Sequence, residues 1–168
     1  MRRLAAWILV LALLASTLTG CGNAFWGDYL EPQVIQCADL TITLPGHFLD
    51  LHDKDYARGL PFVYGFQDTA IMGLKEPRSV LDPYLDECSA TAYAKLFLEV
   101  NKLDVPVEEQ DGLILFRYTQ KSQGAQISYL CAAYMGKTNY WIVQTYCAQA
   151  DMAKLEADFL QILQSVQV

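Results

Sequence analysis

The strongest constraint on the fold is a series of three predicted strands near the C-terminus, joined by short turns. The strands are predicted over residues 112–119, 125–135 and 140–147, with turns over 121–124 and 136–139. Connections of this length join antiparallel neighbours, so the three strands are expected to form a meander. A meander needs a cover for its apolar face, and helices packed against it make an α+β layer architecture.

Two predicted helices can supply that cover. The chain ends in its clearest amphipathic pattern, in which one side of a helix carries Met152, Leu155, Phe159, Ile162, Leu163 and Val166. An earlier helix is predicted to start with Asp82 as its N-cap and Pro83 in its first position, and to end before Pro106. The apolar face of this earlier helix is predicted to consist of Tyr93, Leu96, Phe97, Val100 and Leu103.

Three further strands are predicted ahead of the first helix. Strict alternation of apolar and polar residues over 39–44 predicts a half-buried strand. Residues 62–66 and 69–75 are predicted to form a hairpin that turns at residues 67–68. The predicted order is therefore βββ-α-βββ-α, with an antiparallel sheet of about six strands packed against the helices.

The N-terminus has the features of an export leader. Arg2 and Arg3 precede residues 4–18, which carry no charge and are nearly all apolar. This run is shorter than the ~20 apolar residues that a spanning helix needs. The leader ends in Leu18-Thr19-Gly20-Cys21, a tetrapeptide that resembles the lipobox of bacterial lipoproteins.

The lipobox resemblance implies that residues 1–20 are a signal peptide and that Cys21 carries covalent lipid, with palmitate among its fatty acids. Two or more acyl chains hold a protein firmly in a bilayer. We therefore expect a lipid anchor on the extracytoplasmic face of the cell membrane, and no cofactor besides that lipid. An ordinary secretory signal with an incidental cysteine, or an N-terminal anchor that is never cut, are the alternatives.

The remaining 148 residues divide into a tether and one domain. Residues 21–37 contain Gly27 and Pro32 and lack sustained periodicity, which indicates a lipidated tether. Residues 38–168 are expected to form a single α+β domain, because a chain of this length can bury one hydrophobic core.

The charge of the chain excludes some partners. Without Arg2 and Arg3, 10 basic residues stand against 19 acidic residues, a net charge near −9. Proteins that bind nucleic acid present a basic surface to it, so nucleic acid is not an expected partner of this acidic chain. Anionic lipid repels an acidic surface, so the lipid on Cys21 is expected to supply the membrane attachment.

Several stretches together resemble the Mog1/PsbP-like group, which includes small DcrB-like lipoproteins of bacteria. They are DLTITLPGHF, DECSATAYAKLFLEVN, the run of long hairpins, and the ending YWIVQTYCAQADMAKLEADFLQILQSVQV with its Ser165-Val166 pair. The resemblance covers most of residues 38–168 and implies a Mog1/PsbP-like sandwich. Members of the group are mostly binding or accessory proteins with different partners, so the resemblance implies a fold and not a specific function.

The densest polar cluster lies in a predicted loop and includes the only two histidines: His47, Asp50, His52, Asp53 and Asp55. Imidazole and carboxylate groups can bind zinc or another divalent ion. The spacing matches no closed metal site, and an EF-hand loop starting at Asp53 would place Ala57 and Tyr64 where ligands are required. A metal site and an ordinary solvated loop therefore both stay open.

No other motif indicates catalysis, and we name no catalytic residue. The chain lacks a G-x-S-x-G nucleophile elbow. Linear sequence does not show that any cysteine meets a histidine. Residues 136–138 (GKT) end like a phosphate-binding P-loop, but they lie between two predicted strands and are interpreted as a hairpin turn.

Four further cysteines, Cys37, Cys88, Cys131 and Cys147, can pair in three ways in an oxidising compartment. If residue 135 faces residue 140, Cys131 and Cys147 point to opposite sides of the sheet. A register slipped by one residue would leave them about 13 Å apart, which exceeds the ~7 Å limit for a disulfide. Cys131 is therefore expected to be a buried core residue, or to pair with Cys37 or Cys88.

The predicted strands are rich in tyrosine: Tyr64, Tyr118, Tyr129, Tyr134, Tyr140 and Tyr146. An aromatic face can be a recognition surface. Alternatively, the tyrosines fill a sandwich whose sheet is covered on both faces, with their hydroxyls at the rim.

These patterns lead to one hypothesis and two alternatives. We expect a membrane-anchored, non-enzymatic lipoprotein that binds a protein or another envelope component through loops or a sheet edge. One alternative is a metal-binding or hydrolytic domain that uses the loop from His47 to Asp55. The other is an accessory subunit that scaffolds a membrane complex.

Overall fold

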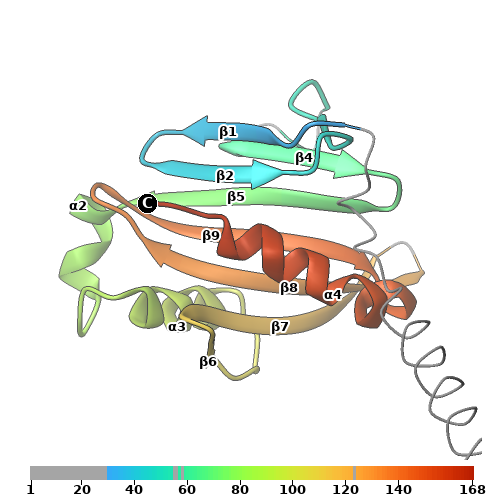
Figure 1. Cartoon of the computed structure of the whole chain (residues 1–168). Helices are drawn as coiled ribbons and strands as arrows, with labels where there is room; N and C mark the ends of the chain where they lie inside the picture. Colours follow the sequence, from blue (N-terminus) through green and yellow to red (C-terminus); the bar gives the residue numbers. More distant parts are fainter. Residues whose placement is uncertain (1–29, 55–56, 58, 123) are drawn as a thin grey trace, which may run out of the picture.

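A seven-stranded antiparallel sheet forms the centre of the structure (Figure 1). The structure is a computed structural model that describes residues 30–54, 57, 59–122 and 124–168. In sheet order the strands are β3 (Leu49–Asp50), β4 (Phe62–Phe66), β5 (Thr69–Pro77), β9 (Asn139–Ala148), β8 (Ala125–Met135), β7 (Leu113–Ser122) and β6 (Glu108–Gln110). The predicted leader, Cys21 and most of the predicted tether lie outside the described residues, as does Asp55.

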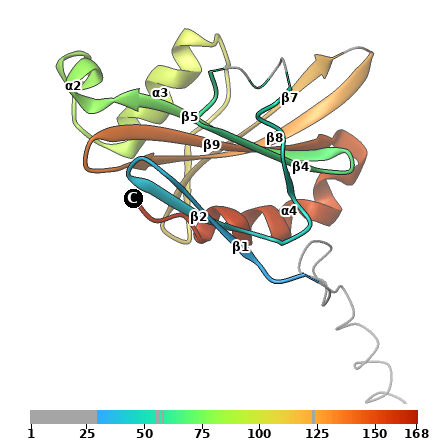
Figure 2. The same cartoon turned by 90° about the horizontal axis from the view of Figure 1, so that it is seen from above.

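The remaining elements lie against the two faces of this sheet. Strands β1 (Gln33–Cys37) and β2 (Leu40–Leu44) form a separate hairpin, and the helices are α2 (Arg78–Leu81), the 3-10 helix η2 (Asp82–Tyr84), α3 (Ala90–Val100) and α4 (Gln149–Gln164). Figure 2 shows α3 on one side of the sheet and α4 with the β1–β2 hairpin on the other. We call these sides the α3 face and the hairpin face. The α+β fold predicted from the sequence is confirmed.

Each face of the sheet has its own hydrophobic core, because neighbouring residues of a strand point to opposite sides. On the hairpin face, Trp141 and Val143 pack with side chains of β2 and α4. On the α3 face, Tyr140 and Ile142 pack with Tyr93 and other α3 side chains. All of these sheet residues are fully buried.

The C-terminal half follows the sequence prediction closely. Strand β8 has the predicted bounds, β9 is one residue longer at each end, and β7 continues to Ser122, which pairs with Ala125. Helix α4 buries the predicted positions Leu155, Phe159, Ile162 and Leu163, while Met152 and Val166 pack at the edge of the core.

The predicted register between β8 and β9 is confirmed. Met135 faces Tyr140, and Cys131 faces Gln144. Cys147 faces Ser128 and lies in the core of the hairpin face, whereas Cys131 lies in the core of the α3 face. The four described cysteines are free thiols, and the opposite orientations of Cys131 and Cys147 exclude a disulfide between them.

Three strands were not predicted from the sequence. Strand β3 has only two residues and lies in the predicted loop, whereas polar residues break the expected pattern in β1 and β6. Strand β1 lies within the segment interpreted as a tether. Its inward-facing residue Gln33 donates hydrogen bonds to the carbonyls of Phe48 (2.6 Å) and Pro45 (3.3 Å), while the apolar Val34 faces outward. Strand β6 has the sequence Glu-Glu-Gln and shows no apolar alternation. The predicted strand over 39–44 exists as β2, but it pairs with β1 and not with the central sheet.

The prediction for the first helix was wrong about its first residue and only partly right about which side chains face the core. Asp82 and Pro83 begin only the three-residue helix η2, and Ser89 caps α3 by accepting a hydrogen bond from the N–H of Ala92 (3.0 Å). The buried positions of α3 are Tyr93, Ala94 and Leu98, and Val100 is 71% exposed. Of the predicted face, Tyr93 is buried and Phe97 and Leu103 pack against the core, whereas Leu96 and Val100 do not. The buried face is therefore rotated toward Ala94 and Leu98.

The carboxylate of Asp39 ties the β1–β2 hairpin to the central sheet. It accepts hydrogen bonds from the backbone N–H groups of Thr138 (2.8 Å) and Asn139 (3.1 Å) in the turn between β8 and β9. The side chains of Thr138 (3.0 Å), Asn139 (2.8 Å) and Trp141 (2.9 Å) donate to the same carboxylate. The hairpin turn predicted at the GKT sequence therefore has a structural role, because it binds the carboxylate of Asp39.

The outer edge of β2 is held by the end of the chain. Thr41 and Gln167 exchange two backbone hydrogen bonds of 2.8 and 2.9 Å. The hydroxyl of Ser165 accepts a hydrogen bond from the N–H of Thr43 (3.0 Å). Ser165, one of the residues that carry the Mog1/PsbP-like resemblance, thus joins the end of α4 to the hairpin.

Replacing Asp39 should destabilise the fold strongly. Asp39→Asn puts an NH2 group among donors that need an acceptor, and hydrogen bonds to a charged group contribute about 1.5–3 kcal/mol each. We expect the free energy of unfolding to fall by about 3 kcal/mol, measured by urea denaturation at neutral pH. Asp53→Asn, on the exposed loop, is the control and should leave the value within about 0.5 kcal/mol.

The same contact predicts a pH dependence. Burial opposes ionisation of Asp39, but the hydrogen bonds from Thr138, Asn139 and Trp141 hold its pKa well below the ordinary value of 3.8. A lowered pKa in the folded state stabilises the protein above the pKa of the unfolded chain, and this stabilisation is lost as pH falls further. The difference in unfolding free energy between wild type and Asp39→Asn should therefore shrink below about pH 4. A difference that stays constant from about pH 6 to pH 3 in urea titrations would contradict this role.

Candidate functional site

Helix α3 covers only part of its face of the sheet (Figure 1). Its 11 residues rise about 16 Å, whereas the 11 residues of β8 extend about 36 Å. The part of the face beyond α3 carries Tyr118, Tyr129 and Tyr146, and all three are partly exposed. Among the described residues, the alternative in which both faces of the sheet are fully covered does not hold for this part of the sheet.

These tyrosines belong to one row of directly opposed residues that crosses six strands. From β3 to β7 the row runs Leu49, Gly65, Ala70, Tyr146, Tyr129 and Tyr118. We call it the sheet row. Its members share the α3 face, because directly opposed residues in antiparallel strands point to the same side.

The tyrosine half of the sheet row is an ordered aromatic stack. The rings of Tyr118 and Tyr129 are nearly parallel, with centroids 4.5 Å apart, and those of Tyr129 and Tyr146 are 5.5 Å apart. Gln144 donates a hydrogen bond to the hydroxyl of Tyr118 (3.2 Å). Burial raises the pKa of Tyr118 and of Tyr129, so both phenols stay neutral at physiological pH.

The other half of the sheet row contains a groove of about 610 Å³. Gly65 and Ala70 are small, so the surface between the larger side chains of Leu49 and Tyr146 is hollow. The other residues that line the groove are Leu51, Gln67, Asp68, Thr69, Ala125, Ile127 and Ala148. A β-carbon on Gly65 would come within 2.6 Å of Leu51 Cδ1, so this position requires glycine unless Leu51 moves.

The groove has the chemistry of a binding surface. Its lining is mainly apolar, and its polar groups come from the turn between β4 and β5 at Gln67 and Asp68. Leu49 is 67% exposed at one border. A concave apolar surface with a few polar groups at its edge is typical of sites that bind a ligand or a protein segment.

The predicted metal-binding loop does not assemble around one point in the described residues. His52 donates from Nδ1 to Asp50 (2.8 Å), and its Nε2 lies 3.2 Å from the carbonyl of Leu60. The hydrogen bond to Asp50 raises the pKa of His52, which favours the imidazolium, a form that cannot bind metal. Hydrogen bonds from His52 lower the pKa of Asp50 despite some burial.

His47 lies in a different environment. Its ring packs 4.0 Å from that of Phe66, centroid to centroid, and burial lowers its pKa. Asp53 is exposed. Outside residues 1–29, 55–56, 58 and 123, no three His, Cys, Asp or Glu residues are grouped so that they could hold a metal ion. A site that includes Asp55 stays a prediction.

Two of the cysteines are unsuited to nucleophilic catalysis. Cys131 and Cys147 are buried, and burial raises the pKa of both thiols, that of Cys147 to about 11. The thiolate, not the thiol, is the nucleophile, so neither residue is reactive at neutral pH. The Cys37 thiol donates to the carbonyl of Pro61 (3.5 Å), and Cys88 is exposed.

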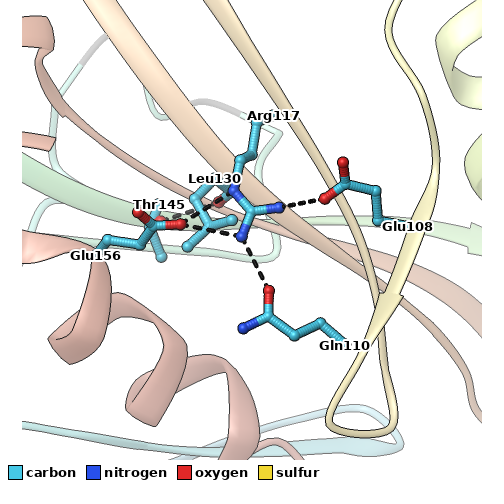
Figure 3. Close-up of polar contacts among 6 residues, drawn as sticks. All are labelled: Glu108, Gln110, Arg117, Leu130, Thr145 and Glu156. Atoms are coloured by element: carbon cyan, nitrogen blue, oxygen red, sulfur yellow. Dashed lines mark hydrogen bonds and ion pairs between the residues drawn. The ribbon is translucent and has the colours of Figure 1, made fainter. Parts of the chain in front are cut away.

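A cluster of charged side chains on the hairpin face has a structural role (Figure 3). Arg117 of β7 donates to Glu108 (2.7 Å) and Gln110 (3.1 Å) of β6, and twice to Glu156 of α4 (3.0 Å each). The short strand β6 and the middle of α4 are thereby joined to β7. Four of the five N–H donors of the guanidinium are used within the fold, so Arg117 is poorly placed to bind an external anion.

Comparison with known proteins identifies the fold. No family model matches the chain. No curated protein matches its sequence either. Among solved structures, a mutant of protein Mog1 is similar over 83% of this chain and 96% of its own, with 11% identity and a TM-score of 0.54. Cyanobacterial PsbP (CyanoP) from Synechocystis sp. PCC 6803 is similar over 89% of this chain and 97% of its own, with 12% identity and a TM-score of 0.52. The predicted Mog1/PsbP-like fold is therefore confirmed, and the chain has the α+β architecture of these two proteins.

Proposed function

We propose that the protein is a non-enzymatic binding or accessory lipoprotein, anchored to the extracytoplasmic face of the cell membrane through Cys21. It binds an envelope protein in the groove of the sheet row. The observation that carries the binding role is the open part of the α3 face. There Leu49, Gly65, Ala70 and Tyr146 border a groove that has no residue of a described helix in its lining.

The chemistry of the groove favours a protein segment as its occupant. The apolar lining gains free energy by burial against apolar side chains, at about 25 cal/mol per Å². Tyr146 offers an aromatic contact surface that loses little conformational entropy on binding. The turn at Gln67 and Asp68 can exchange hydrogen bonds with a peptide backbone at the rim.

The N-terminal sequence supports the anchored location. Eleven residues, 22–32, lie between Cys21 and Gln33, the first residue of β1, so the Cα atoms of Cys21 and Gln33 lie at most about 43 Å apart. A lipid on Cys21 would therefore keep the start of the domain near the bilayer surface. Within the described residues, no helix is both long and apolar enough to span a membrane.

The lipid anchor can be tested directly. In cells fed radiolabelled palmitate, the wild-type protein should take up label and sediment with membranes. Cys21→Ser should lose both the label and the sedimentation, because serine offers no thiol for the lipid. Label in Cys21→Ser equal to wild type, or a wild type that takes up none, would contradict the anchor.

The binding role predicts that filling the groove reduces partner capture. Ala125 lines the groove at the start of β8, so Ala125→Trp should fill it and lower recovery of the bound envelope protein at least tenfold. Recovery is measured by affinity capture of the lipidated protein from its own membrane, followed by quantitative mass spectrometry.

Gln126→Trp is the matched control. Gln126 is the next residue of β8, is also exposed, and points to the opposite side of the sheet. Its recovery of the envelope protein should equal that of the wild type, and both variants should keep the wild-type melting temperature. Equal recovery by both variants, or capture of no protein by the wild type, would count against the groove as the binding site.

A further inference from the structure

Helix α3 carries more apolar surface than the sheet covers. Tyr93, Ala94 and Leu98 are buried against the sheet. Leu96 is only partly buried, and Val100 is 71% exposed. A surface helix normally presents polar residues on the side away from the core, so the exposed apolar side chains on α3 are unusual.

Two hollows lie on either side of Leu96. One, of about 430 Å³, is lined by Leu96 together with Tyr84 and Leu85 from the segment after α2. The other, of about 340 Å³, is lined by Leu96 with Leu81 and Val100. Tyr84 is 78% exposed. We call this surface, defined by Leu81, Tyr84, Leu85, Leu96 and Val100, the α3 ridge.

The charged side chains around the α3 ridge are mostly acidic. Glu76, Asp86, Glu87 and Glu99 line the two hollows, whereas Lys95 is the single basic residue among the lining residues. All five are exposed. The rim therefore carries a net charge near −3, so its electrostatic potential is negative and attracts cationic groups.

From this pattern we infer that the α3 ridge is a docking surface for a segment of a partner protein. Apolar side chains of that segment enter the hollows, and its Lys or Arg residues face the acidic rim. Apolar burial at the centre with charge pairs at the edge is the usual arrangement of a specific protein interface. The acidic rim raises the rate of encounter with a basic segment and disfavours acidic partners.

Two other occupants fit the charges less well. An anionic bilayer is repelled by the four rim carboxylates. A second copy of this chain would bring two acidic rims together if the ridges paired with each other, and like charges across an interface cost several kcal/mol. The α3 ridge shares no lining residue with the groove on the sheet row, so this inference does not depend on the proposed function.

Site-specific crosslinking in intact cells tests the inference. A photoreactive phenylalanine analogue replaces Val100 on the ridge. In the control it replaces Val34, which is on β1 and 66% exposed, close to the 71% of Val100. The full-length protein is used, and the crosslinked peptide is sequenced by mass spectrometry.

We expect position 100 to form an adduct with one protein, through a segment that has apolar residues and a net positive charge, at least fivefold more often than position 34. Glu76→Gln combined with Glu99→Gln should lower the yield at position 100 at least fivefold, because it removes two of the rim charges. Adduct yields no higher at position 100 than at position 34 would overturn the inference. So would adducts with lipid, with a second copy of the chain, or with an acidic segment.

Discussion

The fold depends on one carboxylate in the turn between β1 and β2. Trp141 is fully buried on the hairpin face, and its indole N–H needs an acceptor that water cannot supply. Asp39 provides that acceptor, and the same carboxylate also binds Thr138 and Asn139 in the turn between β8 and β9. One side chain therefore positions the hairpin over the core and allows the largest side chain of that core to be buried.

The two faces of the central sheet are covered to different extents, and this difference determines where the groove lies. On the hairpin face, α4 and the β1–β2 hairpin form a continuous core, and Arg117 joins α4 to the edge of the sheet. On the α3 face, the cover seen in the described residues is the 11-residue helix α3 together with apolar side chains of the segments that flank it: Leu81, Leu85, Leu103, Val105 and Val107. The part that α3 leaves open includes Gly65 and Ala70, whose small side chains create the groove. The groove is therefore a consequence of the short length of α3 and of two small residues.

Local patterns in the sequence predicted the elements that obey one simple periodicity. Strand β8 and helix α4 were located correctly because burial alone governs their residues. Strand β1 was missed because Gln33 faces inward and satisfies its amide through the carbonyl of Phe48. The sheet row could not be predicted, because it requires the pairing of Ala70 with Tyr146, and no short-range pattern reports on residues so distant in the chain. The tyrosines were noted in the sequence, but the small residues that form the groove beside them carried no local signal.

Helix α3 shows how tertiary contacts can override a local pattern and leave apolar side chains exposed. Its sequence periodicity favours burial of Leu96 and Val100 beside Tyr93 and Phe97. Tyr93 stacks on Tyr140 and Phe97 packs against Phe116, but the other buried positions are taken by Ala94 and Leu98. Val100 thus stays outside the core, although burial of a valine contributes about 1.5–3 kcal/mol. Such conflicts between local preference and global fold are expected mainly at functional sites. A partner that covers the α3 ridge would bury the very residues that the sequence pattern marks as apolar, and so resolve the conflict.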